Sequence, residues 1–206
     1  MPTNKEEPGN MLSLTINGRL LPLFFQLLGH GFLMVVQTGS SVKELLCDQL
    51  GVTEDYLEQR IKSIFLNGKV VDDVNTAIVN EGAIMALSGA MPGLVGAILR
   101  TGGYYAPMRS QISYDKNSVP SQFKNGKITL KLWNLVVKEL GPSFLERGIW
   151  IQGDEMRSFI ERQWEALKSG CNAVKLDEKQ ATIEQLEDFA WDADPVFLQV
   201  FPSEVS

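Results

Sequence analysis

The chain has 206 residues and a formal net charge of −6 at pH 7, from 19 Lys and Arg residues against 25 Asp and Glu residues. Hydrophobic residues make up 44% of the chain and charged residues 21%, which excludes a disordered or collagen-like protein. There are 7 basic and 10 acidic residues up to Gly103, and 12 and 15 after it, so each part carries −3. Because nucleic-acid binding needs many Lys and Arg contacts to phosphate, we expect no nucleic-acid partner.

The residue types that most often perform catalysis or hold metals are scarce. His30 is the single histidine, Cys47 and Cys171 are the two cysteines, and no Cys-x-x-Cys pair occurs. We therefore expect no zinc site and no other metal centre. We assign no catalytic residue and no cofactor, and His30 is expected to be a loop or core residue. Reduced thiols are typical of the cytoplasm, where we place the protein, although an oxidised pair stays open.

The ends and the apolar stretches of the chain bear on its location. Residues 1–10 are polar, which predicts a disordered N-terminus without a signal peptide. The longest apolar stretch, residues 20–36, is interrupted by Gly29 and Gly31. Since a membrane-spanning helix needs about 20 mostly apolar residues, we expect this stretch to be core and the protein to have no membrane partner.

The first elements are expected to be strands. Apolar residues at 12, 14 and 16 alternate with polar ones, which predicts a half-buried strand. Asn17-Gly18 favours a type I′ turn, because both central residues of that turn need positive φ. Residues 19–25 are the expected returning strand, and residues 32–37 form another run rich in strand-forming residues.

A helix and three further strands follow. Ser41-Val42-Lys43-Glu44 is a capping box that predicts a helix start, and residues 54–62 predict a second helical piece. Residues 64–66 predict a strand that turns at Asn67-Gly68 and returns at residues 70–71, and residues 83–87 predict a final strand. This order indicates an α+β fold with the helix packed across one face of the sheet. We expect these residues to be buried together: Val42, Leu45, Leu46, Ile64, Leu66, Ile84 and Leu87.

Three segments in this order carry a family resemblance: TGSSVKELL at residues 38–46, LNGKVV at 66–71 and VNEGAI at 79–84. They resemble the ubiquitin-like β-grasp fold, most of all the small sulfur carriers of molybdopterin and thiamine biosynthesis. The resemblance implies a β-grasp domain over residues 11–90 and an adenylating-enzyme-like protein as partner. Ala83 stands where those carriers usually have an acidic residue.

The resemblance does not extend to the chemistry of those carriers. Their activity resides in a C-terminal Gly-Gly, whose carboxylate is adenylated and then converted to a thiocarboxylate. Here the corresponding segment, residues 88–93, is followed by 113 further residues. We therefore expect a non-catalytic protein-interaction or adaptor module. One alternative is a carrier-like precursor that is processed at an internal glycine, either Gly93 or Gly103, since residues 99–103 resemble the tail of ubiquitin.

Residues 91–127 are the expected connector. From Gly82 to Tyr114 there is no Asp or Glu, and glycines are frequent. The segment is either an inter-domain connection or a loop that binds an anion or a flat ligand through backbone amides, guanidinium groups and aromatic rings. The second reading keeps open a small-molecule enzyme or cofactor-binding protein. Its candidate binding residues are Arg100, Gly102, Gly103, Tyr104, Tyr105 and Arg109.

Four apolar side chains inside this connector are costly to leave in water. We expect residues 94–99 to form a short ordered helix that packs against a domain or against a second copy of the chain. A homo-oligomer is therefore one expected arrangement. These four side chains are Leu94, Val95, Ile98 and Leu99.

Residues 128–206 are expected to form a second α/β or α+β domain of no recognised family. Residues 128–140 predict a helix that ends at Gly141-Pro142. The acidic residues 184–194 offer either ligands for a hard cation or a solvated helix face. All four tryptophans lie in this part, where aromatic side chains are usually core. The other predicted elements are a strand at 148–152, helices at 153–168 and after a capping box at 182–185, and strands at 173–176 and 195–201.

Overall fold

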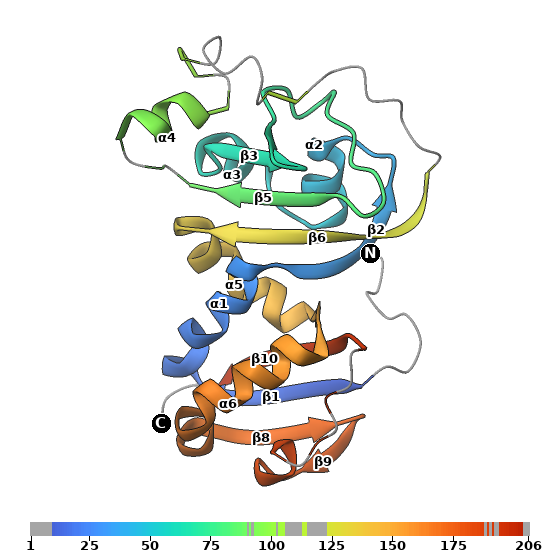
Figure 1. The fold of residues 1–206 in the computed structure, drawn as a ribbon, viewed down its shortest axis with the longest axis vertical. Helices are drawn as coiled ribbons and strands as arrows, with labels where there is room; N and C mark the ends of the chain where they lie inside the picture. Colours follow the sequence, from blue (N-terminus) through green and yellow to red (C-terminus); the bar gives the residue numbers. More distant parts are fainter. Residues whose placement is uncertain are drawn as a thin grey trace. The chain divides into compact units, whose positions relative to one another are not determined.

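A computed structural model describes residues 10–89, 91, 93–101, 103–105, 113–114, 123–187, 189, 191 and 194–203 (Figure 1). The described chain is a mixed α/β protein that divides into two compact units. Of the described residues, the first unit contains those within 33–137, and the second joins residues 10–32 to those within 138–203. This division differs from the expected boundaries after residues 90 and 127, because strands at both ends of the chain pair with each other.

The first unit contains five strands in the order β4-β3-β5-β6-β2. The central pair, β5 and β6, is parallel, and β3 runs antiparallel to both β4 and β5. Parallel neighbouring strands need a long connection, and the chain between β5 and β6 runs from Ser88 to Lys124. The strands are β2 (Phe32–Thr38), β3 (Ser63–Leu66), β4 (Lys69–Val70), β5 (Ile84–Ser88) and β6 (Lys124–Trp133).

The prediction of a helix over residues 128–140 is wrong for its first half, which belongs to strand β6. Ile128, Leu130 and Leu132 are buried, and the residues between them are not, which is the period of a strand. The following helix, α5 (Leu135–Arg147), continues through Gly141-Pro142 instead of ending there. Close packing explains the glycine, since a Cβ at position 141 would lie 2.8 Å from Leu28 Cδ1.

The predicted capping box is confirmed. Ser41 is the N-cap of α2 (Val42–Glu44): its Oγ accepts from the Glu44 N–H at 3.2 Å, and its own N–H donates to Glu44 Oε2 at 2.8 Å. The helix continues as a π-helical turn, η2 (Leu45–Gln49), and α3 (Glu54–Gln59) follows. These two reciprocal bonds satisfy donors that a helix start leaves unpaired.

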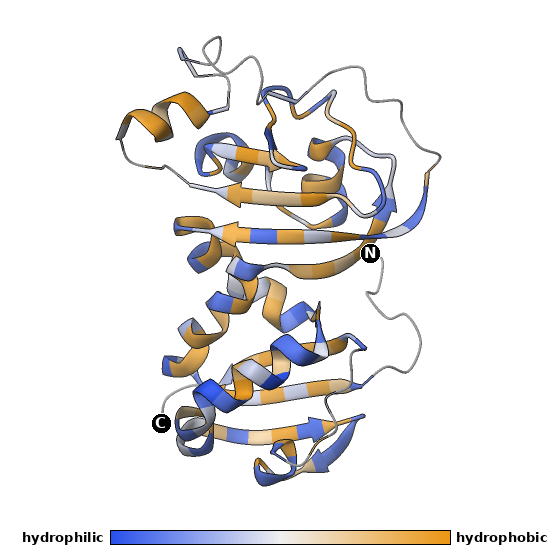
Figure 2. Ribbon diagram, in the orientation of Figure 1, coloured by the Kyte–Doolittle hydropathy of each residue, from blue (hydrophilic) through white to orange (hydrophobic). Residues whose placement is uncertain are grey.

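The predicted core of the first unit is confirmed except at one position. Six of the seven expected side chains are buried, whereas Ile84 is 47% exposed. Ile84 is the first residue of β5, where the period of two places it on the opposite face from Met85. Figure 2 shows apolar residues along β3, β5 and the short helix α4 (Gly93–Leu99).

The second unit also contains five strands, in the order β7-β10-β1-β8-β9. The central pair, β10 and β1, is parallel, and the other pairs are antiparallel. Besides α5, its main helices are α1 (Leu21–His30) and α6 (Gly153–Gly170). The strands are β1 (Met11–Asn17), β7 (Ile149–Ile151), β8 (Cys171–Leu176), β9 (Lys179–Ala181) and β10 (Val196–Ser203). They confirm the predicted strands at both ends of the chain.

The two Asn-Gly dipeptides have different conformations. Asn67 and Gly68 have φ of 51° and 77° and join β3 to β4, as a type I′ turn requires. Asn17 has φ of −58°, and its Oδ1 accepts from the Arg19 N–H at the start of a 3₁₀ turn, η1 (Gly18–Leu20), that leads into α1. The predicted hairpin at Asn17 and the returning strand after it are therefore wrong. Three side chains at helical spacing, Phe24, Leu27 and Leu28, are buried instead.

The two units share a pattern. In each, a parallel pair lies between a single strand (β2 or β7) and a hairpin (β3-β4 or β8-β9), and the single strand leads through a helix into the hairpin. The second hairpin turns at Asp177 and Glu178, whose φ values of 48° and 67° are again both positive. The units differ in the position of the strand that follows the hairpin in the chain. In the first unit this strand, β5, lies beside the hairpin, whereas in the second unit it is β10, which lies beside the single strand β7.

The second predicted capping box, at residues 182–185, is confirmed only in part. The Thr182 N–H donates to Gln185 Oε1 at 2.9 Å, which is one of the two bonds of a capping box. A single 3₁₀ turn, η4 (Glu184–Leu186), follows it in place of the expected helix.

The capping box gives a pH-dependent prediction. Hydrogen bonds from Ser41 lower the pKa of Glu44 below its usual value of 4.5, so its stabilising contribution is present above that pH and is lost as the pH falls through the lowered pKa. We expect Glu44→Gln to reduce the free energy of unfolding at pH 7 and to approach wild type in acid. Denaturant unfolding from pH 7 down to about pH 3 measures this. A difference that stays constant over this range would contradict it.

Leu46 tests the core of the first unit. Leu46→Ala should lower the free energy of unfolding by about 2–5 kcal/mol, because the side chain is fully buried. Ile84→Ala is the matched control and should cost far less, since Ile84 is half exposed. Equal costs for the two variants would contradict the assigned burial.

Candidate functional site

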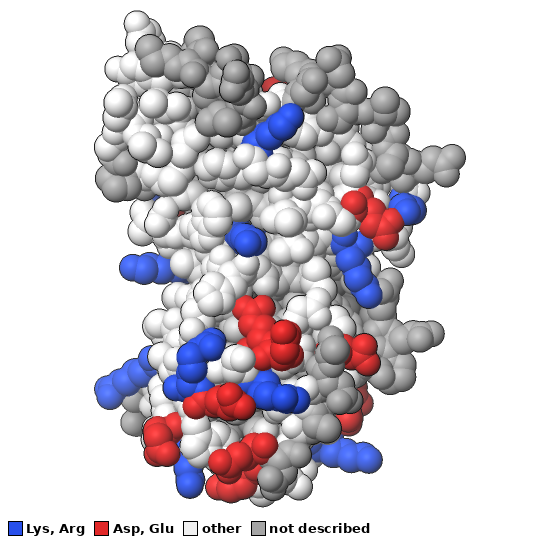
Figure 3. All heavy atoms as spheres, viewed as in Figure 1, with Lys and Arg blue, Asp and Glu red and all other residues white. Residues whose placement is uncertain are grey.

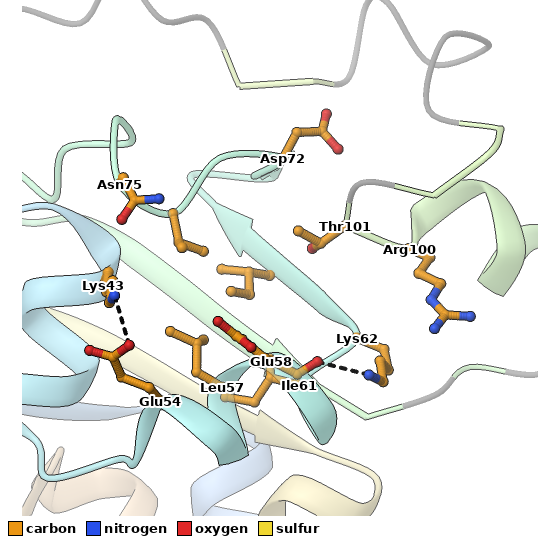
Figure 4. Close-up of a pocket in the computed structure, with 12 residues that line it drawn as sticks. Lys43, Glu54, Leu57, Glu58, Ile61, Lys62, Asp72, Asn75, Arg100 and Thr101 are labelled. Carbon is orange, nitrogen blue, oxygen red and sulfur yellow. Dashed lines mark hydrogen bonds and ion pairs between the residues drawn. The ribbon is translucent and has the colours of Figure 1, made fainter.

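A cavity of about 250 Å³ opens in the first unit between α3, the loop after β4 and the residues that follow α4 (Figure 4). It brings together residues from four separate segments of the chain. Twelve residues line it: Lys43, Glu54, Leu57, Glu58, Ile61, Lys62, Ile64, Asp72, Val74, Asn75, Arg100 and Thr101.

The floor of the cavity is apolar. Leu57 and Ile61 come from α3 and the residues just after it, and both are buried. Ile64 comes from β3, and Val74 comes from the loop after β4. Such a floor is suited to an apolar group of a ligand or partner.

The rim of the cavity is charged. Lys43 Nζ lies 2.9 Å from Glu54 Oε2, and this hydrogen bond and ion pair raise the pKa of Lys43. Lys62 Nζ donates to the backbone carbonyl of Glu58 at 2.9 Å. The two lysines are thereby held at the rim rather than over the apolar floor, as Figure 4 shows.

Thr101 contributes an unusual polar atom. Its N–H donates to the carbonyl of Lys62 at 2.9 Å, which attaches the end of α4 to the start of β3. Its Oγ1 is buried and has no hydrogen-bond partner among the described residues. A buried hydroxyl without a hydrogen-bond partner costs free energy. Thr101 Oγ1 therefore makes the folded protein less stable than an apolar group of the same shape would.

The predicted site residues are only partly brought together. Arg100 lines the cavity, and its carbonyl accepts from the Gly103 N–H at 3.0 Å. The rings of Tyr104 and Tyr105 are 5.2 Å apart, edge to face, and Tyr104 is 90% exposed. Neither tyrosine lines this cavity. Gly102 and Arg109 lie outside the described residues.

The lysines and carboxylates of the rim were missed by the sequence analysis. Lys43, Glu54 and Asp72 are far apart in the chain and form no motif. The only local signal was the amphipathic pattern of residues 54–62, which predicts one buried and one charged side of α3.

The predicted helix at residues 94–99 is confirmed as α4. Gly96 lies on its buried side, where a Cβ would overlap the backbone of Met91, and a second hollow of about 260 Å³ lies between α4 and Lys62-Ser63. Leu94 and Val95 are each 66% exposed. Within the chain, these two side chains therefore do not have the packing that the sequence predicted.

His30 has a carboxylate neighbour in the second unit that sequence proximity did not indicate. Its Nδ1 lies 3.2 Å from Glu155 Oε1, and the histidine is exposed. Burial raises the pKa of Glu155, and His30 opposes that effect. This exposed pair lies at the end of α1 and the start of α6.

The cysteines are free thiols that lie in different units. Burial raises the pKa of both Cys47 and Cys171 above the usual value, which keeps the thiols protonated at neutral pH. Among the described residues, no three potential metal-ligating side chains come together. No helix in the described part of the chain has the length and apolar character needed to cross a bilayer.

Comparison of the chain with protein-family models, with curated proteins and with solved structures gives no match.

The unpaired hydroxyl of Thr101 gives a prediction for the cavity wall. Thr101→Val keeps the shape of the side chain and removes the unpaired group, so we expect an unchanged or higher melting temperature. Thr53→Val is the control: Thr53 Oγ1 accepts from the Tyr56 N–H as the N-cap of α3, and its loss should cost about 1 kcal/mol. Thermal unfolding measures both. An equal loss in the two variants would show that the Thr101 hydroxyl is bonded.

Proposed function

We propose that the protein is a non-catalytic protein-interaction module, and that α4 is its main contact surface. The observation that carries this proposal is the exposure of Leu94 and Val95, each 66%, on a short ordered helix. Leu94 and Val95 are adjacent, so they present contiguous apolar surface, and exposed surface of this kind marks interaction sites. The Thr101–Lys62 hydrogen bond attaches the end of the helix to the sheet, so the surface is preorganised.

The charges beside α4 indicate the chemistry of the partner. Arg100 directly follows the helix, and Lys62 lines the hollow beneath it. Among the residues that the structure describes, no acidic side chain lines that hollow, and the sequence from Gly82 to Tyr114 contains no Asp or Glu. The partner surface that fits is an apolar segment flanked by Asp or Glu side chains.

The first unit supports a ubiquitin-like reading of this module. Its chain order of strand β2, capped helix α2, hairpin β3-β4 and strand β5 is the order that the resemblance implies after the first strand. We propose that β6 takes the place of that first strand, beside β2 and parallel to β5. An adenylating-enzyme-like protein is then one partner of the proposed class.

The position of β6 favours an interaction module over a processed precursor. A cut after Gly103 would separate β6 from the strands it pairs with, since β6 begins at Lys124. It would also leave β1 on a fragment without β8 and β10. Neither unit would keep its central strand pair on one chain.

The test is a double substitution on α4. Leu94→Asp with Val95→Asp should leave the melting temperature near that of wild type, because both side chains are exposed. It should reduce the affinity for protein partners by about tenfold or more, because two apolar contacts would be replaced by charges that repel an acidic partner. Quantitative affinity capture from cell extract, followed by titration with the captured protein, measures this loss.

Phe123→Asp is the matched control, since Phe123 is 72% exposed and lies just before β6. The parallel register pairs Ser88 with Trp133, so Phe123 lies at the other end of β6 from the β5 end that leads to α4. This variant should capture the same proteins as wild type. Equal capture by the α4 double variant would overturn the proposal.

A further inference from the structure

Another cavity, of about 490 Å³, lies in the second unit between α6 and the segment that follows η4. Its size is within the range of small-ligand sites. One wall is the side of α6 that carries Arg157, Glu161 and Trp164 at helical spacing. The opposite wall includes Glu187, Phe189 and Trp191.

Three aromatic residues line this cavity. The rings of Phe189 and Trp191 are 4.7 Å apart with an angle of 60° between their planes, which makes a corner rather than a flat stack. The Trp191 ring is held in place, because its Nε1–H donates to the Leu186 carbonyl at 3.0 Å and the residue is 4% exposed. Trp164 adds a ring from the helix side. Aromatic side chains thus line both walls of the cavity, and the hydrogen bond to Leu186 fixes the Trp191 ring among them.

The charges around the cavity are unequal. Glu161 and Glu187 supply two carboxylates, one from each wall, against the single guanidinium of Arg157. Arg157 Nη2 donates to the backbone carbonyl of Trp191, so part of its hydrogen-bonding capacity is used within the wall. The lining therefore carries one excess negative charge. Figure 3 shows side chains of both signs interspersed on the face of the second unit that it draws.

We propose that this cavity binds a methylated ammonium group. The negative π-faces of aromatic rings attract a cation, and carboxylates nearby add to that attraction without needing a hydrogen bond. A primary ammonium must give up its water shell for ring faces that accept hydrogen bonds poorly. A methylated ammonium is more weakly hydrated and presents methyl groups to the rings, so it fits both the apolar and the negative character of the lining.

This inference does not depend on the proposed role of α4, because it concerns residues of the second unit alone. The same chemistry occurs in a free quaternary ammonium compound and in a trimethylated lysine of a protein. Binding experiments with one probe of each kind distinguish the two sources.

The test is calorimetric titration of the full chain with choline and with a short peptide that contains trimethyllysine. We expect at least one of them to bind, and binding of the peptide alone would identify a protein-borne ligand. The controls are the neutral carbon isostere of choline, in which a quaternary carbon replaces the nitrogen, and the same peptide with unmethylated lysine. Each control should bind about tenfold more weakly or not at all.

Variants locate the site. Glu161→Gln and Trp164→Phe should each weaken binding by several-fold, and Trp164→Ala should abolish it. Glu165→Gln is the matched control, because Glu165 is exposed on the same helix, makes the same change in charge and does not line the cavity. The proposal is overturned if neither probe binds, if the isostere binds as tightly as choline, or if Glu165→Gln weakens binding as much as Glu161→Gln.

Discussion

The parallel pairing of β5 with β6 is the constraint on which the first unit depends. It joins Ile84 to Thr129 and continues to Ser88 and Trp133. The Gly82 N–H donates to the Lys127 carbonyl at 2.7 Å and the Thr129 N–H to the Ala83 carbonyl at 2.8 Å, so the turn before β5 is held by the same strand. This pairing brings the buried side of β6 into the unit, and it places the end of β5 where the chain leaves toward α4. The proposed contact surface therefore depends on a strand that follows it in sequence.

The second unit depends on an equivalent long-range pairing. Met11 is opposite Phe197, so the central strands come from the two ends of the described chain. Parallel strands cannot be joined by a tight turn, and each unit meets this requirement with residues that are distant in sequence. Both units also place a hairpin with two positive-φ residues beside their parallel pair. In both units the hairpin covers one edge of the parallel pair and a single strand covers the other.

The two proposed binding sites differ in the interaction that would drive recognition. At α4, exposed aliphatic side chains beside Arg100 and Lys62 suit an apolar surface with negative charge. In the second unit, aromatic rings beside Glu161 and Glu187 suit a cation with an apolar surface. Opposite signs of charge at the two sites favour different ligands for each unit. The two proposals therefore assign a different ligand to each unit.

Local patterns were sufficient wherever the physical cause was local. The Ser41–Glu44 capping box, the Asn67-Gly68 turn and the helix at residues 94–99 depend on neighbouring residues and were predicted. Asn17-Gly18 carries the same turn signal as Asn67-Gly68, yet it leads into α1, because Phe24, Leu27 and Leu28 gain burial as a helix. Likewise, the residues of β6 form a strand because they pair with β5. The residues that line the cavity beside α3 and the cavity beside α6 come from separate segments of the chain. Strand partners and cavity walls depend on burial and hydrogen bonding between distant residues, and no window of neighbouring residues contains that information.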